Sequence, residues 1–333
     1  MNKELQKIYK SLEEKMSSKI IAYVTGDRPG METQIGKEVV DLFGDHLELI
    51  GKVKKITLIL YTLGGDTMAT WNIINLIREY CEELDIIVPR KARSSGTIMC
   101  LGANKIYMTR QSTLGPIDPS INSPLSPEVS IRPGQVVKIP TSVESVKGYF
   151  DLAKKELSIN RQQELIQPFM KLSDKLHPLL LGDVYRRKSQ IKMIASKLLG
   201  DRISPKKTKN AIVDFLCGDS GSHDYTISYT EAKQLGLNVE LLDKDLNNLI
   251  TEWYNQITSE MLLRKNYDPV LELAKLDKIE YKYIRAVIDS ILFGRHNFVS
   301  EGTLTKIVLP TGVPNQQIND IRVFEGWKED VSK

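Results

Sequence analysis

The stretch "ITLILYTLGGD", residues 56–66, decides the fold of this chain. Its first part is almost continuously apolar or β-branched, as in a strand buried on both faces, and it ends in a glycine turn. Apolar residues then recur at helical spacing over 69–77. "DIIVP" (85–89) and "KIYMT" (105–109) are further buried strands with a helical segment between them. Strand–turn–helix units in series predict an α/β fold with a mainly parallel sheet.

Two adjacent serines follow the second of these strands, in "ARSSGT" at 92–97. The carboxyl ends of parallel strands share one edge of a sheet, so this turn and the Gly64-Gly65 turn are expected to lie at the edge where α/β sheets bind ligands. A glycine pair lets a substrate carbonyl approach the backbone closely. One glycine N–H and the N–H of Ser95 would then form a two-donor oxyanion hole. The competing interpretation is that serine only caps a helix.

The composition is that of a soluble globular protein. Of 333 residues, 41% are hydrophobic and 26% are charged, and the net charge of +4 is too small to indicate nucleic-acid binding. The three cysteines, Cys81, Cys100 and Cys217, have no metal-ligand spacing, so no metal or other cofactor is expected. No apolar run has the length of a membrane helix, and the N-terminus lacks the apolar core of a secretory signal. We expect a cytoplasmic protein; peripheral membrane contact is not indicated, and the composition leaves it open.

The pattern along the chain predicts three regions. An amphipathic helix is expected at 1–18, an α/β core at 19–245, and a helical or mixed accessory region at 246–333. A helix is expected at 33–49 within the core, and prolines make 111–140 loop-like. Helices are expected to follow that loop, at about 141–157, 160–172, 178–199 and 205–216. From 264 onward the sequence has no regular pattern.

Three motifs in order, "LYTLGGD", "KARSSGTIMCLGANKIYM" and "STLGPIDP", resemble the Clp-fold (crotonase-like) serine peptidases. Within them the chain is most similar to the serine dehydrogenase proteinase family, which is related to signal peptide peptidase A and the stomatin-specific protease. The motifs cover residues 56–119, and "SHDYTISYTEAKQLGL" (222–237) is similar to a downstream segment of that family. The resemblance implies a spiral of ββα units with a mainly parallel sheet, a helical insert and a C-terminal accessory segment. It also implies a serine endopeptidase without a cofactor.

The resemblance also implies roles for the residues of the two turns. In this superfamily the nucleophile begins a Ser-x-Gly sequence, which places it at Ser94. Ser95 would then supply a backbone oxyanion donor together with Gly65, while Gly64 would serve mainly as the turn residue. A shift of one residue would instead make Ser95 the nucleophile. Asp66, next to the glycines, is either a helix cap or a substrate contact, and the cap is favoured.

The general base is left open between two residues. The Clp proteases proper use a histidine in the segment that corresponds to "STLGPIDP", but this chain has Ile117 there, with Asp118 as the nearest polar group. The Ser-Lys members of the fold place a lysine at a strand end before a helix, which matches Lys138. The apolar neighbours Val136, Val137, Ile139 and Pro140 would lower the pKa of the amine enough for it to act as a base. The competing interpretation is an edge-strand lysine in solvent. Lys147 is a weaker competitor for this role.

The second candidate base is His223, with the adjacent Asp224 to orient it. It lies near the position where the Clp branch has its catalytic aspartate. The expected substrate is a polypeptide, and the resemblance implies a homo-oligomer. Two alternatives keep the fold and drop proteolysis. One is a catalytically inactive protein that binds peptides or acts as a scaffold, and the other is a crotonase-type enzyme acting on thioesters.

Overall fold

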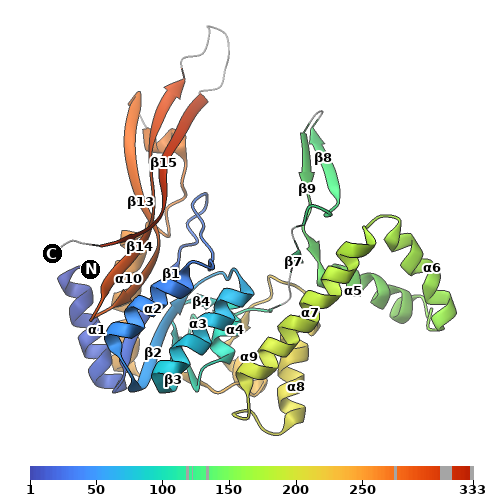
Figure 1. Ribbon diagram of the computed structural model, residues 1–333, viewed down its shortest axis with the longest axis horizontal. Helices are drawn as coiled ribbons and strands as arrows, with labels where there is room; N and C mark the ends of the chain where they lie inside the picture. The colour runs from blue at the N-terminus through green and yellow to red at the C-terminus, as the bar shows by residue number, and fades with distance from the viewer. Residues whose placement is uncertain (118–119, 122, 133–134, 274–275, 308–316, 331–333) are drawn as a thin grey trace. The chain divides into compact units, whose positions relative to one another are not determined.

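A computed structural model describes residues 1–117, 120–121, 123–132, 135–273, 276–307 and 317–330 (Figure 1). The chain forms two compact units. The first comprises Met1–Leu114 and Ser228–Lys333, and the second comprises Gly115–Ile227. The three regions expected from the sequence pattern, 1–18, 19–245 and 246–333, stay a prediction.

The first unit is built on an eight-stranded sheet in the order β12-β5-β3-β2-β1-β13-β14-β15. The five strands from β12 to β1 pair in parallel, so the predicted α/β fold is confirmed. The strands expected at 56–62, 85–89 and 105–109 lie in β2, β3 and β5. The bounds of the parallel strands are β1 (Lys19–Thr25), β2 (Val53–Tyr61), β3 (Cys81–Val88), β5 (Lys105–Met108) and β12 (Val239–Leu241).

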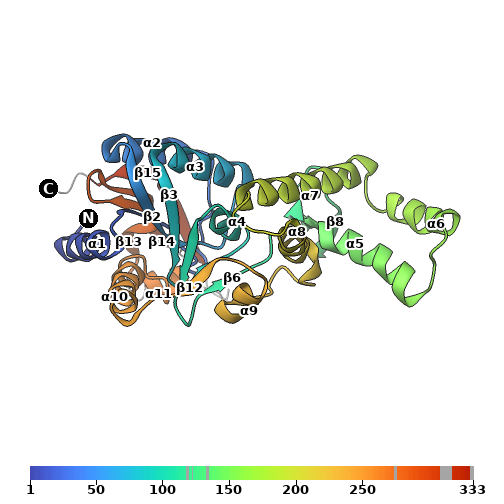
Figure 2. The ribbon, with the colours of Figure 1, turned by 90° about the horizontal axis from the view of Figure 1, so that it is seen from below.

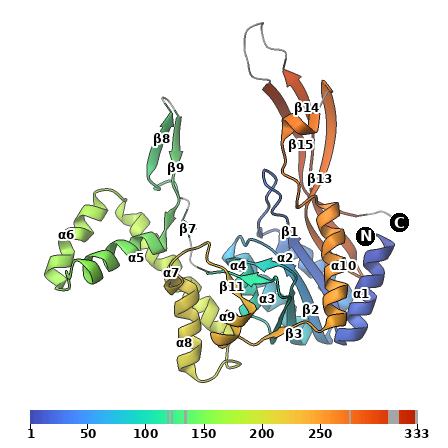
Figure 3. The same cartoon turned by 180° about the vertical axis from the view of Figure 1, so that it is seen from behind.

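Helices cover both faces of this sheet (Figure 2). On one face α1 and α10 lie side by side (Figure 3) and share a core of buried side chains with the strands, Trp253 among them. On the other face α2 packs against α3, and α3 against α4. Phe43 of α2 meets the ring of Tyr23 edge-on, with ring centroids 5.4 Å apart. The bounds are α1 (Lys3–Met16), α2 (Val39–Ile50), α3 (Thr67–Tyr80), α4 (Ser95–Leu101) and α10 (Lys244–Glu260).

The helix expected at 33–49 begins later, at Val39, so the predicted start is wrong. Ile35 has an extended conformation instead and forms a parallel bridge with Gly65. Apolar side chains at helical spacing are also buried when a chain crosses the end of a sheet, which is why the periodicity extended the prediction too far. The extended conformation of Ile35 matters for the candidate site, because it pairs Ile35 with Gly65 of the glycine turn.

The segment after residue 264 forms three long antiparallel strands, although no regular pattern was evident there. They are β13 (Lys278–Ser290), β14 (Gly294–Ile307) and β15 (Gln317–Glu329), and β13 pairs with β1 to continue the sheet. Only the end of β13 beside β1 is continuously buried. The rest of these strands is largely half-exposed, which obscures the alternation that identifies a strand in a sequence.

A buried ion pair ties this sheet extension to the helices. Arg295 donates to both carboxylate oxygens of Asp289, at 2.6 and 2.7 Å, and also to Glu260 of α10 at 2.5 Å. Tyr9 of α1 donates to Asp289 at 2.9 Å and accepts a hydrogen bond from the indole N–H of Trp253 at 2.8 Å. A buried charge is tolerated only when it is paired and hydrogen-bonded, so this network fixes the positions of α1, α10, β13 and β14 together.

The second unit is mainly helical, as expected for 141–216. Its long helix α7 packs on α5 around the side chains of Val143, Leu180 and Val184. The segment expected to be loop-like contains a hairpin of β8 and β9. The elements are β7 (Ser120–Ile121), β8 (Glu128–Arg132), β9 (Gln135–Lys138), β10 (Thr141–Ser142), α5 (Val143–Asp151), η1 (Leu152–Glu156), α6 (Gln162–Ser173), α7 (Pro178–Leu199), α8 (Lys206–Asp214) and η2 (Phe215–Asp219).

The remaining short elements lie in the first unit, apart from Ile227 of β11, which is the last residue of the second. They are β4 (Lys91–Ala92), β6 (Thr113–Leu114), β11 (Ile227–Ser228), α9 (Tyr229–Gln234) and α11 (Pro269–Leu273). Among the residues that the structure describes, no helix combines the length and apolar character needed to cross a bilayer.

Two histidines in the first unit meet in the interior. His46 of α2 shares a hydrogen bond with the Ser290 hydroxyl, at 2.7 Å, and another with His296, at 3.2 Å. Burial, and to a lesser degree the neighbouring His296, lowers the pKa of His46 to about 3. The folded protein therefore holds His46 neutral at a pH where the unfolded chain protonates it.

We expect the first unit to lose stability as the pH falls below about 6.5, the ordinary pKa of histidine. The unfolded chain then takes up a proton that folded His46 does not, at a cost approaching about 1.4 kcal/mol per pH unit. All three tryptophans, Trp71, Trp253 and Trp327, lie in this unit, so urea unfolding followed by tryptophan fluorescence between pH 7 and 5 measures the effect. The variant His46→Leu should flatten the dependence, and His177→Leu in the second unit should retain it. An equally steep dependence in His46→Leu would contradict the assignment.

Candidate active site

Ser94 lies at the turn between β4 and α4 with an uncommon backbone conformation. Its φ is 50° and its ψ is −118°, a region that residues with a side chain rarely adopt. A serine that caps a helix normally has an extended backbone and accepts a hydrogen bond from an N–H of the first turn. Ser94 makes no such bond, and among the described residues nothing pairs with its hydroxyl. The helix-cap interpretation of Ser94 therefore does not fit, and the strained turn indicates a functional position.

Hydrogen bonds on both sides of Ser94 restrain the backbone of this turn. The N–H of Arg93 donates to the carbonyl of Thr62 at 3.1 Å, and the Thr97 hydroxyl donates to the carbonyl of Ala92 at 2.8 Å. Gly96 lies so close to Thr62 that a Cβ atom there would be 2.4 Å from the methyl group of that threonine. The glycine of the Ser-x-Gly sequence is thus required by the close approach of α4 to the end of β2.

The Gly64-Gly65 turn lies directly against Ser94. A Cβ atom added to Gly64 would be 2.9 Å from Cβ of Ser94 and 3.1 Å from the backbone nitrogen of Ser95. Gly65 has a φ of 150°, and a Cβ atom there would be 2.3 Å from the backbone nitrogen of Ile35. The structure thus brings together the four turn residues that the sequence singled out.

Ile35 and Ser95 fix the two peptide groups on either side of Gly65. The N–H of Ile35 donates to the carbonyl of Gly64 at 2.9 Å, and the carbonyl of Ile35 accepts from the N–H of Asp66 at 2.8 Å. The Ser95 hydroxyl donates to the carbonyl of Gly65 at 2.7 Å. In a trans peptide the N–H points opposite to the preceding carbonyl, so the bond from Ile35 directs the N–H of Gly65 away from Ile35. Neither this N–H nor that of Ser95 has an acceptor among the described residues.

Two buried threonines stabilise the Gly64-Gly65 turn. The hydroxyl of Thr62 accepts a hydrogen bond from the N–H of Gly64 at 2.9 Å and pairs with the hydroxyl of Thr25 at 2.6 Å. Both threonines are buried. Asp66 caps α3 by accepting from the N–H of Ala69 at 2.8 Å, which agrees with the favoured interpretation of this residue.

Sequence reasoning missed Ile35, Thr25 and Thr62, as well as the side-chain role of Ser95. Thr25 ends β1 and Thr62 directly follows β2, so in the sequence both resemble ordinary β-branched strand residues. Ile35 had no signal of its own, because its contribution is made entirely by its backbone.

The two candidate bases belong to the second unit, whereas Ser94 belongs to the first. Lys138 is the last residue of β9, and its amine donates to the carbonyl of Pro124 at 2.8 Å and lies 3.9 Å from a carboxylate oxygen of Glu128. Its side chain is 40% exposed, and the expected apolar neighbours Val136 and Ile139 are themselves exposed. The described residues of the second unit therefore do not provide the apolar setting predicted for Lys138.

The remaining predicted site residues are also in the second unit. His223 and Asp224 occupy an exposed turn before β11, and the N–H of Asp224 donates to the hydroxyl of Ser222 at 3.2 Å. Lys147 of α5 lies 3.9 Å from a carboxylate oxygen of Glu144. Asp118 falls outside the described residues. Three or more His, Cys, Asp or Glu side chains do not gather into a metal site anywhere in the described part of the chain.

Comparison with known proteins agrees with this architecture. Residues 46–177 match the family model of the ClpP-like SDH-type serine proteinases. The chain is 28% identical over 208 residues to one uncharacterized protein of Methanocaldococcus jannaschii and 27% identical over 185 residues to a second. These matches cover 62% and 55% of this chain but only 60% and 51% of the relatives. The chain thus spans between half and two thirds of the length of these relatives.

Three solved structures show a limited similarity to this chain. A mutant of the 1510-N membrane-bound stomatin-specific protease is 18% identical, with a TM-score of 0.38 over 71% of this chain and 85% of its own. Another mutant of that protease, in complex with a substrate peptide, is 20% identical, with a TM-score of 0.37 over 69% and 78%. A ClpP1 mutant from Listeria monocytogenes is 14% identical, with a TM-score of 0.36 over 71% and 99%.

The family match confirms the resemblance to the Clp-fold serine peptidases. The family match spans both turns of the candidate site, since it begins in α2 and ends at the start of α7. It supports a peptidase relationship for this chain. The roles of individual residues stay predictions.

The contact between Gly65 and Ile35 predicts the effect of a single methyl group. We expect Gly65→Ala to destabilise the first unit by roughly 2–3 kcal/mol, because the new Cβ would displace the Ile35 backbone. The matched control is Gly44→Ala in the middle of α2, where a Cβ atom meets nothing within 4 Å. This change should stabilise the helix, by up to about 1 kcal/mol. Urea unfolding followed by tryptophan fluorescence measures the stability of both variants. Equal effects of the two changes would contradict the close contact between Gly65 and Ile35.

Proposed function

We propose that this protein is a serine endopeptidase that cleaves peptide bonds through an acyl-enzyme on Ser94. The observation that carries the proposal is the conformation of Ser94, which keeps its hydroxyl out of the helix cap. The N–H groups of Gly65 and Ser95, in the same pair of turns, have no acceptor among the described residues. Strained backbone persists only where the surroundings over-determine it, and such positions cluster at active sites. The family match over residues 46–177 supports the same chemistry.

The proposed reaction begins when a peptide carbonyl lies between Ser94 and the Gly64-Gly65 turn. The oxygen of the Ser94 hydroxyl attacks the carbonyl carbon, and its proton passes to the base. The N–H groups of Gly65 and Ser95 donate hydrogen bonds to the oxyanion that forms. Collapse of this intermediate breaks the C–N bond, and the base returns the proton to the leaving amine. Water then attacks the ester on Ser94 and releases the carboxylic acid.

The base is proposed to be Lys138 or His223. A lysine acts as a base near neutral pH only when its surroundings are apolar, and the side chain of Lys138 is exposed among the described residues of its unit. A bound peptide or a second copy of the chain that covers Val136, Val137 and Ile139 would supply them, since all three are now exposed. The proposed homo-oligomer and the proposed polypeptide substrate are therefore both relevant to this candidate.

His223 needs no such burial, because an ordinary histidine already exchanges its proton near neutral pH. Asp224 follows it directly in the same exposed turn and is proposed to orient it. Lys138 therefore requires a bound peptide or a second copy of the chain in order to act as the base, whereas His223 requires neither.

A fluorophosphonate probe tests the nucleophile. We expect the folded protein to be labelled on Ser94 and the variant Ser94→Ala to lose labelling. Ser95→Ala keeps its backbone N–H but loses the hydrogen bond to Gly65, so it should be labelled about tenfold more slowly, because oxyanion donors lose effect when displaced. Labelling that survives in Ser94→Ala and disappears in Ser95→Ala would place the nucleophile one residue later. No labelling of any folded form would overturn the proposal.

The pH dependence of labelling distinguishes the bases. We expect either Lys138→Met or His223→Gln to reduce the labelling rate by a factor of about 10² or more, the usual contribution of a general base. The other variant, and the control Lys171→Met at an exposed position of α6, should keep both the rate and its pH dependence. Mass spectrometry of the labelled peptide measures the rates from pH 5 to 10. Unchanged rates in all three variants would rule out both candidates.

One observation favours a second candidate function, a protein that binds extended peptides without cleaving them. Lys138 makes its hydrogen bond to the carbonyl of Pro124 and has exposed neighbours, so it is not prepared as a base within this chain. The labelling experiment separates the two functions, because a peptide-binding protein without an active serine would not react.

Residence in the cytoplasm stays a prediction.

A further inference from the structure

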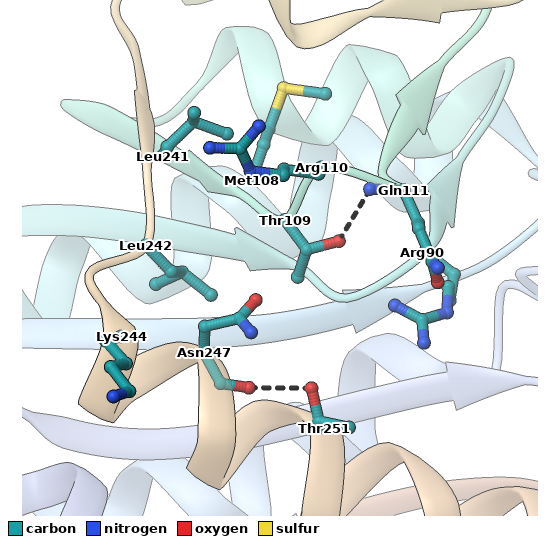
Figure 4. A pocket seen from close by; sticks show the side chains of 10 residues that line it. All are labelled: Arg90, Met108, Thr109, Arg110, Gln111, Leu241, Leu242, Lys244, Asn247 and Thr251. Carbon is teal, nitrogen blue, oxygen red and sulfur yellow. Dashed lines mark hydrogen bonds between the residues drawn. The ribbon is translucent and has the colours of Figure 1, made fainter.

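A cavity in the first unit takes no part in the proposed reaction. It has a cavity volume of about 530 Å³ and opens where β5 and β12 end, beside the first turns of α10 (Figure 4). Carboxyl ends of parallel strands are the usual place for a ligand in an α/β sheet. The volume is in the range of small-molecule and cofactor sites, which is roughly 300–1,000 Å³.

The charged side chains that line this cavity are all positive. They are Arg90 after β3, Arg110 after β5, and Lys244 at the start of α10, and no aspartate or glutamate lines it. None of the three cations forms an ion pair among the described residues. Asp243, which precedes Lys244, is engaged by the N–H of Leu246 at 2.9 Å as the cap of α10. The walls of the cavity thus carry a positive charge that no carboxylate of the lining balances.

Arg90 is the most informative of these residues, because it is half-buried. Its guanidinium group lies 4.6 Å from the centre of the Tyr254 ring and donates to the carbonyl of Pro89 at 3.2 Å. Partly buried cations are ordinarily paired with an anion, since burial raises the cost of an unpaired charge. The aromatic ring holds Arg90 in position without neutralising it. A guanidinium group held in this way is suited to bind an anion from solution.

The remaining lining combines polar groups with apolar walls. The hydroxyl of Thr109 accepts from the N–H of Gln111 at 3.1 Å, and Figure 4 shows the Asn247 amide extending toward Thr109. Arg90 and Arg110 approach from different sides of the same space. Met108, Leu241 and Leu242 contribute apolar surface. Such a site fits a ligand with a multiply charged anionic group and a less polar body.

We propose that this cavity binds a phosphorylated small molecule of about the size of a mononucleotide. Phosphate carries the two or more negative charges that match a lining of three cations, whereas a single carboxylate carries one. Arginine binds phosphate through paired, charge-assisted hydrogen bonds, and the apolar walls accommodate the organic part of the ligand. Arg90 lies in the segment that leads to the serine turn, so an occupied site would contact the chain close to Ser94 in sequence.

Calorimetric titration of the full chain tests the proposal with four probes, which are AMP, ATP, pyrophosphate and citrate at physiological ionic strength. We expect AMP or ATP to bind one per chain with a Kd below about 1 mM. Citrate is the control for charge without phosphate and should bind at least tenfold more weakly. Failure of all three phosphate compounds to bind, or binding of citrate as tight as theirs, would overturn the proposal.

Two variants locate the binding. Arg90→Gln and Arg110→Gln should each weaken the nucleotide by about tenfold or more, because each removes a charge-assisted hydrogen bond. Arg110 is exposed and has no bond or ion pair among the described residues, so its variant tests the site even if Arg90→Gln disturbs the packing on Tyr254. Arg161→Gln, an exposed arginine of the second unit, is the matched control and should leave binding unchanged. Equal affinities in Arg110→Gln and Arg161→Gln would contradict the site.

Discussion

The candidate active site depends on the pairing of one extended residue with a glycine turn. Ile35 accepts and donates a backbone hydrogen bond across the Gly64-Gly65 turn, and the hydroxyl of Ser95 fixes the same turn from the other side. These three bonds leave the N–H of Gly65 directed away from Ile35. A donor held in place before the substrate arrives costs no reorganisation during the reaction, which is why preorganised N–H groups are effective catalysts.

Further contacts on the serine turn explain why Ser94 can have a strained backbone. A residue outside the common regions costs on the order of 1–3 kcal/mol, and this cost is met only if neighbouring bonds leave no relaxed alternative. Bonds from Arg93 and Thr97, with the close approach of Gly96 to Thr62, restrain the chain on both sides of Ser94. The Ser-x-Gly sequence is thus a packing requirement as well as a family motif.

Much of the fold follows from local sequence, and the exceptions have physical causes. The buried runs in β2, β3 and β5 are fully apolar because both faces of the sheet are covered, so they were predictable. The strands β13 to β15 were not, because their half-exposed residues lack a clear alternation. Ile35 was assigned to a helix since its side chain fits the helical spacing, and backbone pairing with a distant turn leaves no local pattern.

The site was predictable in its turns and less so in its proton acceptor. The glycine and serine turns each end a buried strand, and a parallel sheet brings them together at one edge. Both proposed bases lie in the second unit, where the apolar residues around Lys138 predicted burial. In the described part of that unit no layer packs over the two-stranded hairpin beside them, and these side chains are exposed. Apolar composition predicts burial only where another element covers the residue.

The most direct test of the central claim is a crystal structure of the protein after reaction with a diphenyl phosphonate peptide. The account predicts a covalent bond from phosphorus to Oγ of Ser94, with the phosphonyl oxygen about 2.7–3.1 Å from the backbone nitrogens of Gly65 and Ser95. The group nearest the leaving-group position would then identify the base. Phosphorus on Ser95, or a phosphonyl oxygen directed away from both nitrogens, would contradict the account.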